Sequence, residues 1–284
     1  MLRESQEDLD KVNAVDLYDT SYGHYAARLY EEVRKETYGE DIGQTSWMTV
    51  AEFRRIFTML ELTPASQVLE IGCGAGACAA YMVESVGCHV TGIDVNENGV
   101  RNANQLARIR KLDSRLRFER ADASQRLPFA DQSFDAVVSN DAMCHVPRRL
   151  AVLKEWYRVL RPGGRALYTD AMIVTGALSN EEVAARGSIG YYLFLPPGEN
   201  ERLIREAGLE LLRADDVTEA AAALSKRWHD ARALRKSELV KVEGEANFEG
   251  LQTFLDCVHN VARERRLSRF LYLARKREGV WRRQ

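Results

Sequence analysis

The chain has 284 residues, of which 45% are hydrophobic, so it is long enough to bury one large core with extensions. Its 40 basic and 42 acidic residues give a formal net charge of -2, which excludes a global field that would draw the protein to nucleic acid or to anionic lipid. The charge balance therefore predicts a small-molecule partner.

The N-terminus is charged from its first residues, and no segment approaches about 18 uninterrupted apolar residues. The five cysteines show neither C-x-x-C pairs nor the spacing of metal ligands. These features predict a cytoplasmic protein with reduced thiols, no bound metal and no membrane association. The sequence leaves the oligomeric state open and allows a homodimer.

Residues 1–62 carry apolar side chains at helical spacing. Helices of this kind bury an apolar stripe against a sheet or against other helices, so this segment predicts a helical lid over a face or mouth of the core. The apolar positions form two groups, Leu9, Val12, Val15 and Leu17, then Val50, Phe53, Ile56, Phe57 and Leu60.

From residue 67 to residue 170, short β-branched apolar runs alternate with longer helical patterns, which is typical of a parallel sheet wound by helices on both faces. The strand-like runs are "QVLEI", "CHVTGID", "LRFERAD", "FDAVVSN" and "GRALYTD". Helices are predicted over 77–86, 98–111 and 148–160, and "RPGG" at 161–164 is predicted as the turn that ends the last of them.

Two further strand-like stretches, "GLELLRADD" (208–216) and "LSRFLYLARK" (267–276), flank an almost continuously helical segment. We therefore predict an α/β fold: a Rossmann-like, doubly wound, mostly parallel seven-stranded sheet with N-terminal helices and a helical cap inserted before the last strand. The predicted parts are a lid over 1–62, a core over 63–216 and 267–278, and a cap over 217–266.

The stretch "VLEIGCGAG" (68–76) ends a strand and then places Gly72, Gly74 and Gly76 within five positions. Glycine lets the backbone approach a ligand closely, and the helix that follows points unpaired N–H groups toward that ligand. Followed by Ala77, these glycines also satisfy the dinucleotide fingerprint G-x-G-x-x-G/A, with Asp94 at the end of the next strand. The loop alone leaves NAD binding open.

Glu70, two residues before the first glycine, separates the candidate ligands. Its carboxylate would repel a pyrophosphate but would suit a ligand with a free ammonium group, such as S-adenosylmethionine. Asp94 would then accept hydrogen bonds from the ribose hydroxyls, and Asp122, at the end of the third strand, from the adenine amino group. Three acids on three consecutive strand ends are more specific than the glycine loop alone.

These residues resemble the class I S-adenosylmethionine-dependent methyltransferases, and the likeness covers most of residues 38–276. It implies S-adenosylmethionine as the cofactor and adds Val95, Ala123 and Asn140 to the cofactor-binding candidates. The similar motifs are "LEIGCGAG" (69–76), "GID" (92–94), "RADA" (120–123), "LPFADQSFDAVVSNDAMCHV" (127–146), "LRPGGRALYTD" (160–170) and "RFLYLARK" (269–276).

A narrower similarity exists to small-amine methyltransferases of the phosphoethanolamine and sarcosine type. "SNDAMCH" (139–145) looks like their segment in which an acid holds the cationic substrate and a histidine removes a proton. This likeness implies that Asp141 binds the substrate and that His145 is the general base. "YGEDIGQTSW" (38–47) is similar to their segment that closes over the methionine end of the cofactor, which implies roles there for Gln44 and Ser46.

The tyrosine that partners the histidine in that subfamily has three candidates in this chain, Tyr18, Tyr22 and Tyr25, and Tyr25 is taken as the catalytic one. Of the residues that clamp a phosphate there, only Arg186 has a match. The neighbouring "GSIGYYLFLPP" is more apolar than a phosphate pocket, which argues against a phosphorylated amine.

The combined prediction is a methyltransferase that acts on a small-molecule acceptor by in-line transfer. An amine is the first choice of acceptor because Asp141 would hold a cation and His145 would remove its proton. Hydroxyls and acidic carbons are also open. The alternatives are an enzyme on the same fold that consumes the cofactor as a cyclase or lyase and releases methylthioadenosine, and an NAD-binding or non-catalytic Rossmann module.

Overall fold

The computed structural model describes residues 15–278. The predicted apolar positions Leu9 and Val12 therefore lie outside the described residues. Within 15–278, none of the helices combines the length and the apolar character needed to cross a membrane.

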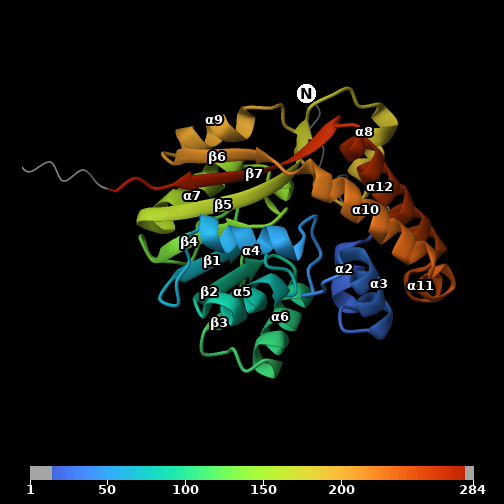
Figure 1. Ribbon diagram of the computed structural model, residues 1–284, viewed down its shortest axis with the longest axis horizontal. Helices are drawn as coiled ribbons and strands as arrows, with labels where there is room; N and C mark the ends of the chain where they lie inside the picture. The colour runs from blue at the N-terminus through green and yellow to red at the C-terminus, as the bar shows by residue number, and fades with distance from the viewer. Residues whose placement is uncertain (1–14, 279–284) are drawn as a thin grey trace, which may run out of the picture.

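A seven-stranded sheet forms the centre of the molecule, in the order β3-β2-β1-β4-β5-β7-β6 (Figure 1). β1 to β5 pair in parallel, while β7 runs antiparallel to both of its neighbours. This arrangement confirms the predicted Rossmann-like, mostly parallel sheet. The strands are β1 (Gln67–Ile71), β2 (His89–Asp94), β3 (Leu116–Arg120), β4 (Phe134–Ser139), β5 (Leu160–Val174), β6 (Glu210–Asp216) and β7 (Leu267–Arg275).

Helices cover both faces of this sheet, which makes three layers. The buried side chains of α4, α5 and α6 form one apolar cluster with β1 and β2, and those of α7 and α9 form a second cluster on the opposite face. Burial of these apolar side chains is the main term that stabilises such a layered core. The helices are α4 (Val50–Met59), α5 (Ala77–Val86), α6 (Glu97–Ile109), α7 (Arg149–Val159) and α9 (Glu199–Glu206).

The segment "RPGG" differs from its prediction. The helix before it ends at Val159 and β5 begins at once with Leu160, so no separate turn lies between them. Leu160 pairs with Phe134 and Arg165 pairs with Ala136, so residues 161–164 form a bulge inside the strand. Gly163 takes a φ of +81° there, which favours glycine.

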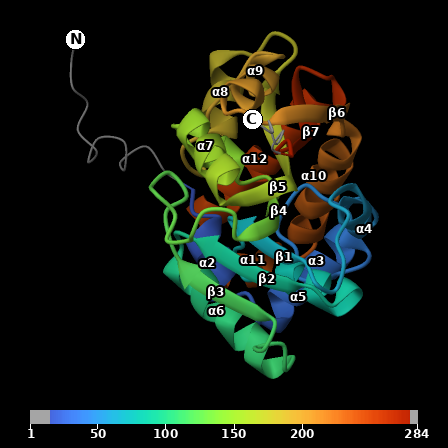
Figure 2. The same cartoon turned by 90° about the vertical axis from the view of Figure 1, so that its left-hand side faces the viewer.

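A separate helical layer lies beyond the carboxyl ends of the strands, where α3 contacts α10 (Figures 1 and 2). Their apolar side chains form a further buried cluster around Trp47, Trp228 and Phe254. The three-part division into lid, core and cap stays a prediction. The remaining helices are α2 (Tyr18–Gly23), α3 (Arg28–Tyr38), η1 (Met143–His145), α8 (Asn180–Arg186), α10 (Thr218–Ala233), α11 (Lys236–Glu243) and α12 (Glu245–Arg263).

Candidate active site

A cavity of about 580 Å³ lies between the carboxyl ends of the strands and the helical layer. Ligands of open α/β sheets bind at this edge, where parallel strands present the loops that follow them. Two parts of the wall differ in chemistry. One carries the strand-end acids Glu70, Asp94 and Asp122, and the other is mostly aromatic, with Tyr18, Tyr22, Trp47, His145, Arg186, Tyr191, Tyr192 and Trp228.

The glycine loop shapes the acidic part of the wall. Gly72 and Gly74 both have positive φ, and a side chain would collide with Ala142 at the first and with the Tyr22 hydroxyl at the second. Gly76 also has positive φ but is absent from the cavity wall, because its Cα packs against Phe118 in the core. Packing alone thus accounts for glycine at position 76, and its predicted part in cofactor binding stays a prediction.

Glu70 lies at the bottom of this acidic part and is 2% exposed. Its Oε2 atom has no hydrogen-bond partner among the described residues. Burial, together with the nearby Asp94 carboxylate, raises the pKa of Glu70 to about 8. A buried carboxyl with an unused oxygen fits the ammonium group of S-adenosylmethionine, which would supply the missing partner and the opposite charge.

Asp94 closes the glycine loop. Its Oδ2 accepts the N–H of Gly74 at 2.8 Å and its Oδ1 accepts the N–H of Asn96 at 2.8 Å. Each carboxylate oxygen can accept a second hydrogen bond, so both remain able to bind a pair of hydroxyl groups. Val95, which follows it, lines the cavity and is 59% exposed, as an apolar surface for a flat ring would be.

Asp122 and Ala123 line the cavity beside Asp94, as expected of the third strand end. The Oδ1 of Asp122 accepts the N–H of Ser124 at 2.8 Å, which fixes the turn. With the glycine loop, these residues form a pocket that fits the nucleoside part of the expected cofactor.

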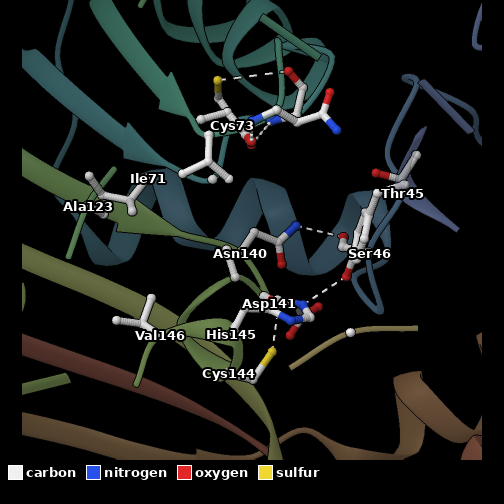
Figure 3. Close-up of a pocket in the computed structure, with 18 of the residues that line it drawn as sticks. Thr45, Ser46, Ile71, Cys73, Ala123, Asn140, Asp141, Cys144, His145 and Val146 are labelled. Atoms are coloured by element: carbon white, nitrogen blue, oxygen red, sulfur yellow. Dashed lines mark hydrogen bonds between the residues drawn. The ribbon is translucent and has the colours of Figure 1, made fainter. Parts of the chain in front are cut away.

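The segment before α4 covers the opposite wall. Ser46 lies across from Asn140, whose Nδ2 donates to the Ser46 Oγ at 2.6 Å (Figure 3). Gln44 also lines the cavity, but its amide group bonds within its own loop, to the N–H of Ile42 and the carbonyl of Glu40. All three predicted residues of this region therefore reach the cavity, with Gln44 shaping the loop.

His145 lies in η1 with both ring nitrogens in hydrogen bonds. Nδ1 is 2.9 Å from the carbonyl oxygen of Tyr191, which can only accept, so Nδ1 carries the proton. Nε2 is then the acceptor for the Tyr18 hydroxyl at 2.8 Å. Burial lowers the pKa of His145 to about 4, so the ring is neutral near pH 7.

The tyrosine beside His145 is Tyr18 and not Tyr25. The Tyr25 hydroxyl donates to the carbonyl of Gly43 at 2.7 Å, and its ring lies under the guanidinium of Arg34, away from the cavity wall. The helix explains the difference: α2 ends at Gly23, and within it Tyr18 and Tyr22, four residues apart, share one face. Glycine often ends a helix, so Gly23 is the signal in the sequence that could have separated Tyr25 from Tyr18 and Tyr22.

Asp141 lines the cavity, and its predicted role in holding the substrate stays a prediction, but its carboxylate already has partners within the protein. Its Oδ1 accepts Nε of Arg269 at 2.8 Å and its Oδ2 accepts the N–H of Trp47 at 3.0 Å. The side chain of Arg269 is fully buried and that of Asp141 is 6% exposed. Asp141 is therefore held in an ion pair with a buried guanidinium, which Glu52 shares, and both of its carboxylate oxygens are engaged within the protein.

Arg186 brings a positive charge to the aromatic part of the wall. Its guanidinium lies 4.2 Å from the ring centre of Tyr192 and 5.2 Å from that of Phe254. Although the residue is 2% exposed, its Nη1 atom has no hydrogen-bond partner among the described residues. The Tyr192 ring also packs on His145, with 4.4 Å between ring centres, so the cation and the histidine share one neighbour.

Comparisons with known proteins agree on the fold and on the chemistry of the donor. Residues 69–168 match the family described as "Methyltransferase domain". The 27-O-demethylrifamycin SV methyltransferase of Amycolatopsis mediterranei (strain S699) is 35% identical over 199 residues, which are 69% of this chain and 72% of that protein. Methyltransferase GfsG of Streptomyces halstedii is 35% identical over 58% of this chain, which spans 60% of its length.

Curated glycine/sarcosine/dimethylglycine and phosphoethanolamine N-methyltransferases match at 29% and 30% identity, but this chain spans only 36% and 43% of their lengths. Among solved structures, phosphoethanolamine N-methyltransferase 2 of Haemonchus contortus superposes with a TM-score of 0.76 at 18% identity, over 93% of this chain and 61% of that one. At that identity the superposition supports the fold alone.

Proposed function

The chain belongs to the class I S-adenosylmethionine-dependent methyltransferases, which here act on a small molecule, and we propose that it methylates a hydroxyl group with His145 as the general base. The observation that carries this proposal is the pairing of Asp141 with Arg269. With Asp141 directed at Arg269 and Trp47, the groups left to meet an acceptor are the buried cation of Arg186 and a neutral histidine.

Charge disfavours a cationic amine in this position. An ammonium acceptor would approach the guanidinium of Arg186, whose charge has no carboxylate partner among the described residues. In a buried site, two like charges at short distance repel by several kcal/mol, roughly 4 kcal/mol at 4 Å for an effective dielectric constant near 20. A neutral hydroxyl avoids this cost, and Arg186 would stabilise the negative charge that develops on oxygen as its proton leaves.

The chain supplies three functions to the reaction. S-adenosylmethionine provides a methyl group on a cationic sulfur. Glu70, Asp94 and the glycine loop would hold its ammonium and ribose groups, and the aromatic part of the same cavity would take the acceptor. The Nε2 of His145 takes the hydroxyl proton, and the aromatic wall excludes water that would compete for the proton and the methyl group.

Tyr18 has a supporting part in this scheme. Its hydroxyl donates to Nε2 of His145 at 2.8 Å, so it occupies the lone pair that the acceptor proton requires. Burial raises the pKa of Tyr18 well above 10, so its hydroxyl stays protonated, and its hydrogen bond to Nε2 must break before an acceptor hydroxyl can bind there. In the free protein, Tyr18 therefore marks the position of the reacting oxygen.

The relatives are consistent with an oxygen acceptor. The 27-O-demethylrifamycin SV methyltransferase, at 35% identity, is named for a substrate that lacks a methyl group on oxygen. The N-methyltransferases resemble this chain at 29% and 30% identity over a smaller share of their own lengths. The aromatic wall suits an acceptor with a sizeable apolar frame around its hydroxyl group.

Matched pairs of acceptors test the proposal, each pair sharing one apolar frame and differing only in a hydroxyl or an amino group. The purified protein and S-adenosylmethionine are incubated with each compound, and mass spectrometry follows methylated products and the nucleoside. Methylation of hydroxyl members with release of S-adenosylhomocysteine supports the proposal. Preferential methylation of the amines would contradict the oxygen assignment. Release of methylthioadenosine would instead indicate the cyclase or lyase alternative.

A further inference from the structure

Arg269 is a fully buried cation on β7 whose guanidinium reaches two carboxylates from distant parts of the chain. Its Nε donates to Asp141 Oδ1 at 2.8 Å and its Nη1 donates to Glu52 Oε1 at 3.0 Å. Asp141 follows β4 and Glu52 lies in the first turn of α4. The rigid, planar fork of arginine can hold two carboxylates at once in fixed directions, which the single ammonium of lysine cannot do.

Both carboxylates also accept hydrogen bonds from backbone N–H groups of one short segment. The Oδ2 of Asp141 accepts the N–H of Trp47 at 3.0 Å. The Oε2 of Glu52 accepts the N–H of Thr49 at 3.1 Å, as half of the capping box that begins α4. The two backbone groups are two residues apart, so Arg269 fixes the stretch 47–49 from both sides.

The backbone of Asp141 is held in an unusual conformation. Asp141 has a φ of +53°, which is uncommon for a residue other than glycine, and its N–H donates to Thr169 Oγ1 at 2.9 Å. The same threonine hydroxyl donates to Asn140 Oδ1 at 3.2 Å, and Asn140 bonds Ser46. A residue other than glycine in the left-handed region of backbone conformation is strained. Such strain is found where the surrounding structure holds a side chain in one fixed orientation.

The segment fixed in this way joins the two parts of the cavity. Residues 43–47 line the wall beside the expected methionine end of the cofactor. The Trp47 ring packs at 5.9 Å from that of Trp228, on the side where the acceptor binds. The backbone of Arg269 also contacts α10, the helix that carries Trp228: its N–H donates to the hydroxyl of Thr218 at the start of that helix.

We propose that Arg269 is a positioning residue for methyl transfer: through Asp141 and Glu52 it sets the distance between the donor wall at 43–47 and the acceptor wall at Trp228. It touches neither ligand, because it is absent from the cavity wall. Displacement of reacting groups by about 1 Å lowers a transfer rate steeply, which gives a remote clamp of this kind a role in the reaction. The inference does not depend on the acceptor being a hydroxyl.

Arg269→Lys tests the proposal, with Arg158→Lys as the matched control. Arg158 bonds Glu155 and Asp131 on the far side of α7, away from the cavity wall. Three quantities are measured in each protein: the melting temperature, the Kd of S-adenosylhomocysteine by calorimetry, and the amide exchange of residues 43–52. Arg269→Lys is expected to raise this Kd about tenfold and to speed exchange in 43–52. Arg158→Lys is expected to lower the melting temperature alone.

A second variant covers the case in which Arg269→Lys fails to fold. Asp141→Asn keeps an oxygen that can accept the Trp47 N–H but gives up the ion pair with Arg269, so it is expected to raise the Kd about threefold. Unchanged Kd and unchanged exchange in 43–52, with only a lower melting temperature in either variant, would reduce Arg269 to a structural residue and overturn the proposal.

Discussion

The two parts of the cavity wall differ in how the chain builds them. The proposed donor part comes from Glu70, Gly72, Gly74, Asp94 and Asp122, which lie at or just after the ends of three consecutive strands within about fifty residues. The acceptor part comes from α2, η1, the loop after α8, and α10, over more than two hundred residues. A site on adjacent strand ends is fixed by the sheet itself, while a site shared by distant helices depends on their packing.

The two parts also differ in charge. Three acids line the part proposed for the donor, and Oε2 of Glu70 has no hydrogen-bond partner within residues 15–278. In the other part, Asp141 is paired with Arg269, which also binds Glu52, His145 is uncharged and Arg186 adds a cation. This polarity suits a cationic donor on one side and a developing oxyanion on the other. Substitutions in the two parts should therefore separate binding of the donor from the rate of transfer.

His145→Ala should give the largest effect, and it should fall on the rate alone. Loss of a positioned general base costs about 10²–10⁴ in turnover, because the hydroxyl proton has no acceptor. The Kd of S-adenosylhomocysteine should stay that of the wild type, since His145 lies outside the donor pocket. A variant that turned over at the wild-type rate would remove His145 from the reaction.

The pH profile of the wild type sharpens the same point. The pKa of His145 falls from 6.5 to about 4 through burial, so its neutral, basic form persists well below pH 6. At saturating S-adenosylmethionine, turnover should hold as pH falls from 8 to about 5 and should then decline. The free energy of unfolding depends on the same side chain. The contribution of neutral His145 is complete above pH 6.5 and is lost as pH falls through its folded pKa of about 4. A decline centred near pH 6.5 would show an exposed histidine.

Asp94→Ala should act on binding of the donor. The variant removes an acceptor for two ligand hydroxyls and also leaves the N–H groups of Gly74 and Asn96 without their carboxylate. Loss of charge-assisted hydrogen bonds at about 1.5–3 kcal/mol each predicts an affinity for S-adenosylhomocysteine at least about 100-fold weaker. Asp122→Ala, at the rim of the same pocket, is the control and should cost less. Equal losses in both variants would contradict the central place given to Asp94.

Tyr18→Phe should give the smallest effect of the series. Its hydroxyl makes one hydrogen bond to Nε2 of His145, worth about 0.5–1.5 kcal/mol, which must break before the acceptor can bind there, so turnover should rise between about twofold and tenfold. Tyr25→Phe is the matched control, because the Tyr25 hydroxyl bonds the carbonyl of Gly43 instead. A change of this size in Tyr25→Phe, with none in Tyr18→Phe, would restore Tyr25 as the partner of the base.

The contrast between the two parts also explains what the sequence could predict. Strand ends and their acids follow from local alternation and glycine positions, so the fold and the placement of Glu70, Asp94 and Asp122 were accessible. The ion pair between Asp141 and Arg269 joins residues 128 positions apart, and no local pattern indicates it. Arg186 shows as an arginine in an apolar stretch, but only the structure reveals that it is buried beside Tyr192 and Phe254, with Nη1 lacking a hydrogen-bond partner in the described part of the chain.

The central claim is that the buried carboxyl of Glu70 receives the ammonium group of the donor. Because burial raises its pKa to about 8, Glu70 is mostly protonated in the free protein at pH 7 and must ionise when the ammonium binds. Calorimetric titration with S-adenosylhomocysteine at pH 7, in buffers of different ionisation enthalpy, measures the protons released. The account predicts release of about one proton by the wild type and none by Glu70→Gln, which should also bind more weakly. Equal proton release by both proteins, with equal affinity, would contradict it.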